Sequence, residues 1–218
     1  MAILATDPNI LNRSGAKTEF RLVLGSPSPA RMELLQQLDI SVEVVPGELE
    51  ELLDTSNFEA LVQSRALMQA TRSRIISNAS TVDKNRLQKY VLGLDTIIVV
   101  DGEIITRPKS VIDARKMLIQ LSGKTHKVVT GIAIISPDNR TSCSLQTTEV
   151  TFREIEAAEL DAYLKTSDPL YNIGGYSLQG PGGIFVKGIN GCYANALGVP
   201  LPSIASVLRG LGMPVLGM

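Results

Sequence analysis

The sequence has few of the residues that build metal centres or disulfide frameworks. It contains one histidine, His126, and two cysteines, Cys143 and Cys192. A single histidine excludes a histidine-rich zinc site, and the cysteines lack the spacing of a cysteine metal site. Two cysteines are also too few for a disulfide framework, so we expect a reducing cytosol and interpret both as packing residues. We interpret His126 as a structural residue beside a strand.

Two further features are absent: a strong charge of one sign and a long apolar run. The 21 basic and 22 acidic side chains give a net charge of −1, which favours neither nucleic acid nor an anionic surface as a partner. No apolar run approaches the ~18 residues of a membrane span. The apolar start of the chain meets Asp7 and Pro8 too early for a signal peptide. We therefore expect a cytoplasmic protein.

The order of sequence patterns favours an α/β fold. Hydrophobic residues make up 44% of the chain and charged residues 20%, as in ordinary globular domains. Residues 1–20 form a polar extension and residues 21–213 the expected domain. Strands are predicted at 21–24, 42–45, 90–100, 103–106, 127–135 and 142–152, and helices at 29–38, 58–77, 110–121, 156–165 and 202–211.

One predicted helix carries a cation on its apolar side. The inward stripe of helix 58–77 is expected to contain Phe58, Leu61, Val62, Met68, Ile75 and Ile76. Arg65 falls within this stripe, four residues after one member and three before another. A cation on an inward face needs a partner, so Arg65 is a candidate functional residue.

The junction between the first strand and the first helix has the character of an anion site. Ser28 is a good N-cap and Pro29 suits the first helical position. Arg31 lies in the first turn, where the helix dipole favours an acidic residue, and a bound phosphate would explain a cation there. The alternative is a capped helix start with a solvated arginine, because the segment lacks the glycine pattern of a P-loop.

Three other clusters carry charge. Asp95 precedes the apolar run 97–100, Arg107 and Lys109 flank a proline, and residues 48–51 are acidic at three of four positions. Each has a structural alternative, namely a turn cap, a solvated loop and surface charge. Taken together, cations that bind phosphate oxygens and carboxylates that bind a divalent ion favour chemistry on a nucleoside polyphosphate.

Glycine is concentrated near the end of the chain. Seven of the 18 glycines lie within residues 174–191. This density predicts a loop whose backbone comes close to another group.

In their order and spacing these motifs resemble those of the Maf proteins over about residues 21–202. The matching segments are Ser26-x-Ser28-x-x-Arg31, Gly93-x-Asp95-Thr96, Arg107-Pro108-Lys109, residues 101–103, 121–126, 150–153 and 174–180, and Gly198-x-Pro200. The resemblance implies a two-lobed α/β fold like that of the inosine-triphosphate pyrophosphatases, with a central mixed sheet and flanking helices. It also implies a nucleoside triphosphate pyrophosphatase that cleaves between the α and β phosphorus atoms, with Mg²⁺, or Mn²⁺ or Co²⁺ in its place.

The resemblance assigns roles to individual residues. Asp95 becomes the proton acceptor and metal-linked carboxylate, with Glu51 as the second acidic group, and whether Asp95 is a base or only a ligand stays open. The residues expected to bind the triphosphate are Ser26, Ser28, Arg31, Arg65, Arg107 and Lys109.

Base preference depends on a smaller set of residues. Thr96 and Gln179 match the branch of the family that prefers dTTP and UTP, and an amide can both donate to and accept from a pyrimidine edge. Ala30 and Asn172 replace basic residues common in the family, which bears on substrate preference. The alternatives are a pyrophosphatase for 7-methyl-GTP or another modified nucleotide, and a non-hydrolysing nucleotide-binding regulator of cell division and septum formation. The resemblance is also compatible with a homodimer.

Overall fold

The computed structural model describes residues 20–49, 57–79, 87–166 and 169–217. Within them, seven strands form one mixed sheet in the order β2-β1-β3-β5-β6-β7, with β4 paired to β3. The strands are β1 (Phe20–Leu24), β2 (Val42–Val44), β3 (Gln88–Val100), β4 (Glu103–Ile105), β5 (Thr125–Ile135), β6 (Thr141–Phe152) and β7 (Val186–Asn190). The predicted α/β class is confirmed.

The helices connect and cover these strands. They are α1 (Pro29–Gln36), α2 (Phe58–Ala79), α3 (Val111–Leu121), α4 (Ala157–Thr166), α5 (Tyr193–Ala196) and α6 (Leu201–Gly210), with 3₁₀ turns at Pro169–Tyr171, Ile173–Gly175 and Pro181–Phe185. None of the described helices is long and apolar enough to cross a membrane.

The glycine-rich segment contains more regular secondary structure than the predicted loop. It contains two of the 3₁₀ turns and the edge strand β7, which pairs with β6 through a register shift between Thr151 and Phe152. Gly174 and Gly175 have φ values of 72° and 75°, which glycine adopts readily. The local sequence predicts the turns but not the strand, because residues 186–190 become a strand only through their pairing with β6.

Both cysteines are free thiols. Cys143 is exposed on β6, and Cys192 is partly buried just before α5. The interpretation of Cys143 as a packing residue is therefore wrong, because its position on β6 lies toward solvent.

One edge of β3 is open in the middle. β5 pairs along residues 91–99, while β1 and β4 share the opposite edge. β1 covers this edge only up to Leu92, and β4 begins to cover it at Ile98. The segment between them, residues 93–97, has no neighbouring strand on this edge among the described residues. Ligands of α/β proteins commonly bind at such interruptions beyond the carboxyl end of a strand.

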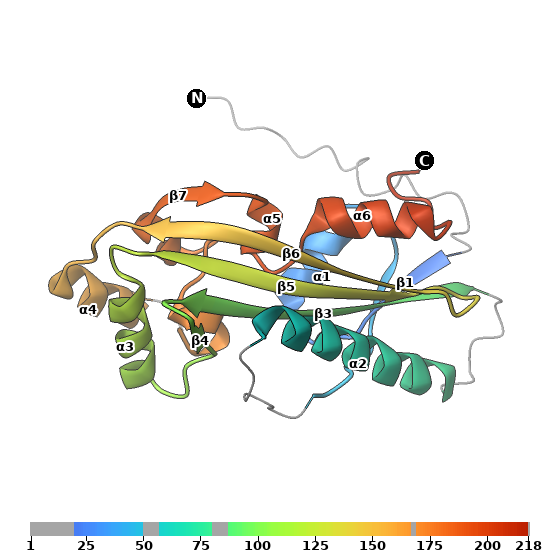
Figure 1. Ribbon diagram of the computed structural model, residues 1–218, viewed down its shortest axis with the longest axis horizontal. Helices are drawn as coiled ribbons and strands as arrows, with labels where there is room; N and C mark the ends of the chain where they lie inside the picture. The colour runs from blue at the N-terminus through green and yellow to red at the C-terminus, as the bar shows by residue number, and fades with distance from the viewer. Residues whose placement is uncertain (1–19, 50–56, 80–86, 167–168, 218) are drawn as a thin grey trace.

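Two separate cores lie on one face of the sheet. Leu92, Leu94 and Ile132 pack with α1 and α6, whereas Ile98 and Val128 pack with α3 and α4. Between them lie Thr96 and Thr130, whose hydroxyl oxygens are 3.1 Å apart. Figure 1 shows α3 and α4 at one end of the long strands and α6 toward the other, with α1 nearer their middle. The polar pair thus divides the domain into the two lobes that the family resemblance implies.

The opposite face of the sheet is covered by α2 (Figure 1). Its buried residues are Val62, Ala66, Gln69, Ala70, Ser73 and Ser77. Ile75 and Ile76 are exposed, so the predicted stripe is wrong at its end and only Val62 of that set is fully buried. The cause is close packing, because the helix contacts the sheet through small side chains and leaves no room for large ones.

Glycines in the sheet allow this close contact. A Cβ atom at Gly93 would lie 2.0 Å from the carbonyl oxygen of Ala66, and one at Gly131 would lie 2.2 Å from that of Val62. The helix backbone therefore rests directly on β3 and β5. Arg65 lies in the same helical turn, which places it over the strand residue Asp95 opposite Gly131.

His126 is buried in the core of the second lobe. It is 1% exposed, and its Nε2 lies 2.7 Å from the hydroxyl oxygen of Tyr176. Nδ1 has no hydrogen-bond partner within the described residues. Burial lowers the pKa of His126 to about 4. The interpretation of His126 as a structural residue agrees with this environment.

We expect Gly93→Ala to lower the free energy of unfolding by about 3 kcal/mol, because the new methyl group would push a helix backbone off the sheet. Urea titration measures this change. Gly188→Ala in β7 is the matched control, since a Cβ atom there meets nothing within 4 Å. Equal effects of the two substitutions would contradict the packing described for α2.

His126 should make stability depend on pH. In the unfolded chain the His126 side chain has its ordinary pKa of 6.5, whereas in the folded protein its pKa is about 4. Between these two pH values the unfolded chain therefore binds a proton that the folded protein does not bind. Stability is therefore lost as the pH falls from 6.5 to 4, by up to about 1.4 kcal/mol per pH unit. Urea titrations over this pH range give the free energy of unfolding at each pH. This free energy should fall less steeply with decreasing pH in His126→Gln than in the wild-type protein, and an identical pH dependence would exclude a buried neutral imidazole.

Candidate active site

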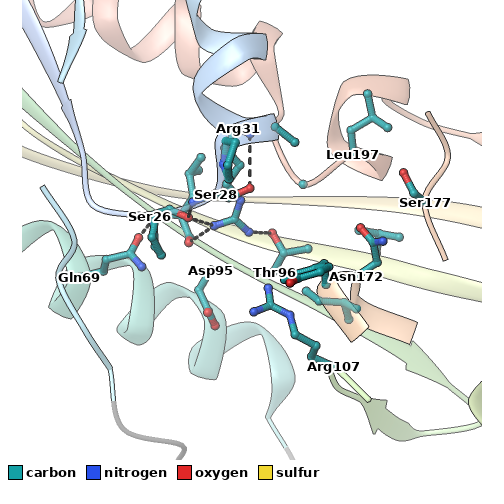
Figure 2. Close-up of a pocket in the computed structure, with 18 of the residues that line it drawn as sticks. Ser26, Ser28, Arg31, Gln69, Asp95, Thr96, Arg107, Asn172, Ser177 and Leu197 are labelled. Atoms are coloured by element: carbon teal, nitrogen blue, oxygen red, sulfur yellow. Dashed lines mark hydrogen bonds between the residues drawn. The ribbon is translucent and has the colours of Figure 1, made fainter. Parts of the chain in front are cut away.

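A cavity of about 950 Å³ opens beside the uncovered edge of β3. Its wall combines the β1–α1 turn, the start of the β2–α2 connection, α2, β3, Arg107 and the segments 171–173, 176–179 and 196–198. The sequence-predicted residues that line it are Ser26, Ser28, Ala30, Arg31, Arg65, Asp95, Thr96, Arg107, Asn172 and Gln179. Figure 2 shows several of these side chains converging from both lobes. Lys109 is exposed and is not among the lining residues, and Glu51 lies outside the described residues.

The start of α1 has the predicted capped geometry. Ser28 has extended backbone angles, and its hydroxyl accepts from the Arg31 N–H at 3.4 Å. Pro29 occupies the start of the helix, and the Ser26 hydroxyl accepts from the Ser28 N–H at 3.4 Å. The first turn of α1 contains no acidic residue. The helix therefore directs its N-terminal end at the cavity without a carboxylate to compete with an anion.

Arg31 is held by the protein. Its guanidinium donates to the carbonyl oxygen of Leu94 at 2.7 Å, to the hydroxyl of Thr96 at 2.8 Å and to the hydroxyl of Ser26 at 3.2 Å. Burial lowers the pKa of Arg31 to about 10, with Asp95 opposing this shift and Arg107 adding to it. The alternative of a solvated arginine is thus wrong. An anion in the cavity would stabilise this desolvated charge.

Asp95 is the partner that Arg65 requires. The Arg65 Nε donates to the Asp95 Oδ2 at 2.9 Å, and the Asp95 side chain is only 16% exposed. Burial raises the pKa of Asp95, while Arg65 and Arg31 oppose that rise. The carboxylate consequently accepts a proton more readily than an exposed one would.

Arg107 follows the end of β4 and points toward the same region (Figure 2). Its side chain is exposed, while the neighbouring Pro108 is buried and anchors the segment. Among the described residues, three arginines and two carboxylates, Asp95 and Glu48, line the cavity. This balance suits a polyanionic ligand.

Thr96 takes part in positioning Arg31. Its hydroxyl accepts from Arg31 and is also bonded to Thr130, so its hydrogen-bonding capacity is largely used within the protein. Gln179 has an exposed side chain at the cavity wall, in the segment from the second lobe. Of Thr96 and Gln179, the Gln179 side chain is therefore the more accessible to a bound base.

The sequence reasoning missed several residues of the site. Gln69 of α2 lines the cavity and contacts β3, and Thr130 supports Thr96 from β5. Gly198, which the motif comparison includes without assigning it a role, has a φ of 79° and passes close to Arg31, where a Cβ atom would lie 3.6 Å from the guanidinium. One signal in the sequence could have identified Gln69: it is a long polar residue on the face of α2 that otherwise carries mainly small residues.

The chain is similar to two curated pyrophosphatases over most of its length. The chain is 38% identical over 197 residues to the dTTP/UTP pyrophosphatase of Ruminiclostridium cellulolyticum, covering 89% of this chain and 98% of that one. It is 38% identical over 196 residues to the dTTP/UTP pyrophosphatase of Bacillus cereus, covering 89% and 92%. A solved nucleoside-triphosphatase, the dITP/XTP pyrophosphatase of Mycobacterium abscessus, aligns with a TM-score of 0.40 at 16% identity over 88% of this chain and 94% of that one.

The family model described as Maf-like protein matches residues 21–211, which include every described segment that lines the cavity. The chain therefore belongs to the Maf family.

Proposed function

We propose that this protein is a nucleoside triphosphate pyrophosphatase that hydrolyses dTTP and UTP to the monophosphate and pyrophosphate. The observation that carries the proposal is the cavity at the open edge of β3, which Arg31, Arg65 and Arg107 line together with the partly buried carboxylate of Asp95. Relatives at 38% identity that bear the name dTTP/UTP pyrophosphatase support the same reaction and the same substrates.

The triphosphate is expected to bind between the two lobes. The N-terminal end of α1 and the serine hydroxyls of the β1–α1 turn offer hydrogen-bond donors on one side. Arg107 offers an exposed guanidinium on the other. These groups neutralise the charge that develops on pyrophosphate as it leaves, which is the main electrostatic requirement of phosphoryl transfer.

A divalent cation fits this donor set when it arrives with the nucleotide. Among the described residues no group of three or more acidic, histidine or cysteine side chains gathers to hold a metal alone. Mg²⁺ usually binds through one or two carboxylates together with substrate phosphates and water. Asp95 supplies one carboxylate, and Glu51 remains the proposed second. The cation would neutralise charge on the phosphate oxygens.

Asp95 is proposed to act on the attacking water. The water oxygen bonds to the α-phosphorus, the bond from that phosphorus to the oxygen bridging to the β-phosphorus breaks, and pyrophosphate leaves. Asp95 accepts the water proton, for which its raised pKa is suited. Arg65 holds the carboxylate in place through its hydrogen bond to Oδ2.

The test is a screen of purified protein with Mg²⁺ against UTP, dTTP, CTP, GTP and 7-methyl-GTP. We expect pyrophosphate as the inorganic product, with UTP and dTTP hydrolysed fastest. Release of orthophosphate instead would contradict cleavage at the α–β bond. Preference for 7-methyl-GTP would favour the modified-nucleotide alternative, and tight binding without turnover would favour a regulatory nucleotide-binding protein.

Asp95→Asn should lower kcat for UTP by about 10²-fold or more, because it removes a positioned proton acceptor while keeping the shape of the side chain. The matched control is Asp161→Asn, which alters another aspartate paired with an arginine, where neither residue of the pair lines the cavity. Steady-state pyrophosphate release measures both variants. Near-normal turnover of folded Asp95→Asn would place the catalytic group elsewhere.

Gln179→Glu should lower kcat/KM for UTP and dTTP by roughly 10- to 10³-fold, since it removes an amide donor and adds a negative charge at the base. GTP and 7-methyl-GTP present different edges and should lose less. The comparison needs kcat/KM for each nucleotide with both proteins. An equal fall for all of them would show that Gln179 serves the phosphates or the fold.

A further inference from the structure

The open edge of β3 leaves the backbone N–H and C=O of Leu94 without partners in the sheet. Alternate residues of β3 direct their N–H and C=O groups away from β5, and the carbonyl of Leu92 accepts from the Gly25 N–H on that side. Leu94 has the same orientation, but β1 has ended before reaching it. A buried N–H or C=O without a partner costs about 1–3 kcal/mol, so the sequence must supply substitutes.

Two side chains supply them. The Leu94 N–H donates to the Gln69 Oε1 at 2.9 Å, and the Leu94 carbonyl accepts from Arg31 at 2.7 Å. Figure 2 shows Gln69 reaching from α2 and Arg31 from α1 toward this stretch of β3. The peptide units immediately before Asp95 are therefore held from both sides of the sheet.

Gln69 is itself fixed by tight packing. It is 8% exposed, and a Cβ atom at Gly25 would lie 2.8 Å from its Cγ. A Cβ atom at Gly47 would lie 2.4 Å from its backbone oxygen. The turns that contain Gly25 and Gly47 thus pack closely against Gln69 and restrict the movement of its side-chain amide away from Leu94.

We infer that Gln69 is a positioning residue for the pyrophosphatase reaction, acting through the Leu94 amide to set the place of the Asp95 carboxylate. The inference rests on the proposed function. Arg65 restrains the carboxylate itself, whereas Gln69 restrains the backbone that carries it. A displacement of about 1 Å at a reacting group can reduce turnover by roughly 10²-fold, so the loss of this restraint should affect the chemical step.

The test replaces Gln69 by methionine, which has a similar length and lacks the amide acceptor. We expect Gln69→Met to lower kcat for UTP by about 10- to 100-fold, with KM changed by less than about 3-fold, because the phosphate-binding groups stay in place. Amide hydrogen exchange measured by NMR should show faster exchange at Leu94. Exchange at Leu94 reports on the hydrogen bond independently of activity.

Ser73→Ala is the matched control. Ser73 lies one turn further along the same buried face and packs against the same two glycines, but it makes no hydrogen bond to β3. This variant should keep kcat within about 2-fold and leave exchange at Leu94 unchanged. The inference is overturned if Gln69→Met exposes the Leu94 amide yet keeps wild-type kcat, or if both variants lose kcat and stability in parallel. Absence of pyrophosphate release from the wild-type protein would instead overturn the proposed function, and with it the catalytic part of the inference.

Discussion

The interruption in the pairing of β3 is the constraint on which the site depends. β1 and β4 cover the two ends of one edge and leave the middle open, so backbone groups there need other partners. Arg31 reaches this edge from α1, and Gln69 reaches it from α2. The same interruption provides the space of the cavity. Filling the gap with a continuous strand would satisfy the backbone but eliminate the site.

A second constraint is the contact between α2 and the sheet. Because Gly93 and Gly131 lack side chains, the helix backbone rests on β3 and β5 and carries Arg65 to the Asp95 carboxylate. Burial favours the protonated acid, while the nearby arginines favour the ionised one. These opposing effects keep a charged group in a partly desolvated place, where it acts more strongly on a phosphate or a proton than it would in water.

Much of this arrangement is local and could be predicted from the sequence. Ser28 and Pro29 determine the start of α1 by their own conformational preferences, and Asp95 is recognisable as a carboxylate in an apolar strand. The Maf motifs added the grouping of these segments around one substrate. Helical periodicity places Arg65 on the inward face of α2 and shows that it needs a partner, but only the fold identifies that partner as Asp95.

The rest depends on contacts between distant segments. The predicted inward stripe of α2 is wrong at Ile75 and Ile76. Hydrophobicity predicts large residues on the inward face, whereas the close contact at the glycines of the sheet leaves room only for small ones. β7 was missed because its pairing with β6, not its own sequence, makes it a strand. Gln69 was missed for a related reason. It bonds the Leu94 N–H only because β1 ends before it reaches Leu94, and the local sequence does not show where that pairing stops. Lys109 was grouped with Arg107 by proximity in sequence, yet only Arg107 lines the cavity.

The most direct test of the central claim is a crystal structure with Mg²⁺ and a UTP analogue whose α and β phosphorus atoms are bridged by nitrogen. We expect the triphosphate to lie along the open edge of β3 between Arg31 and Arg107. The α-phosphorus should be beside Asp95 and the uracil near Gln179. A triphosphate bound on another surface, or one whose α-phosphorus lies far from Asp95, would contradict the central claim.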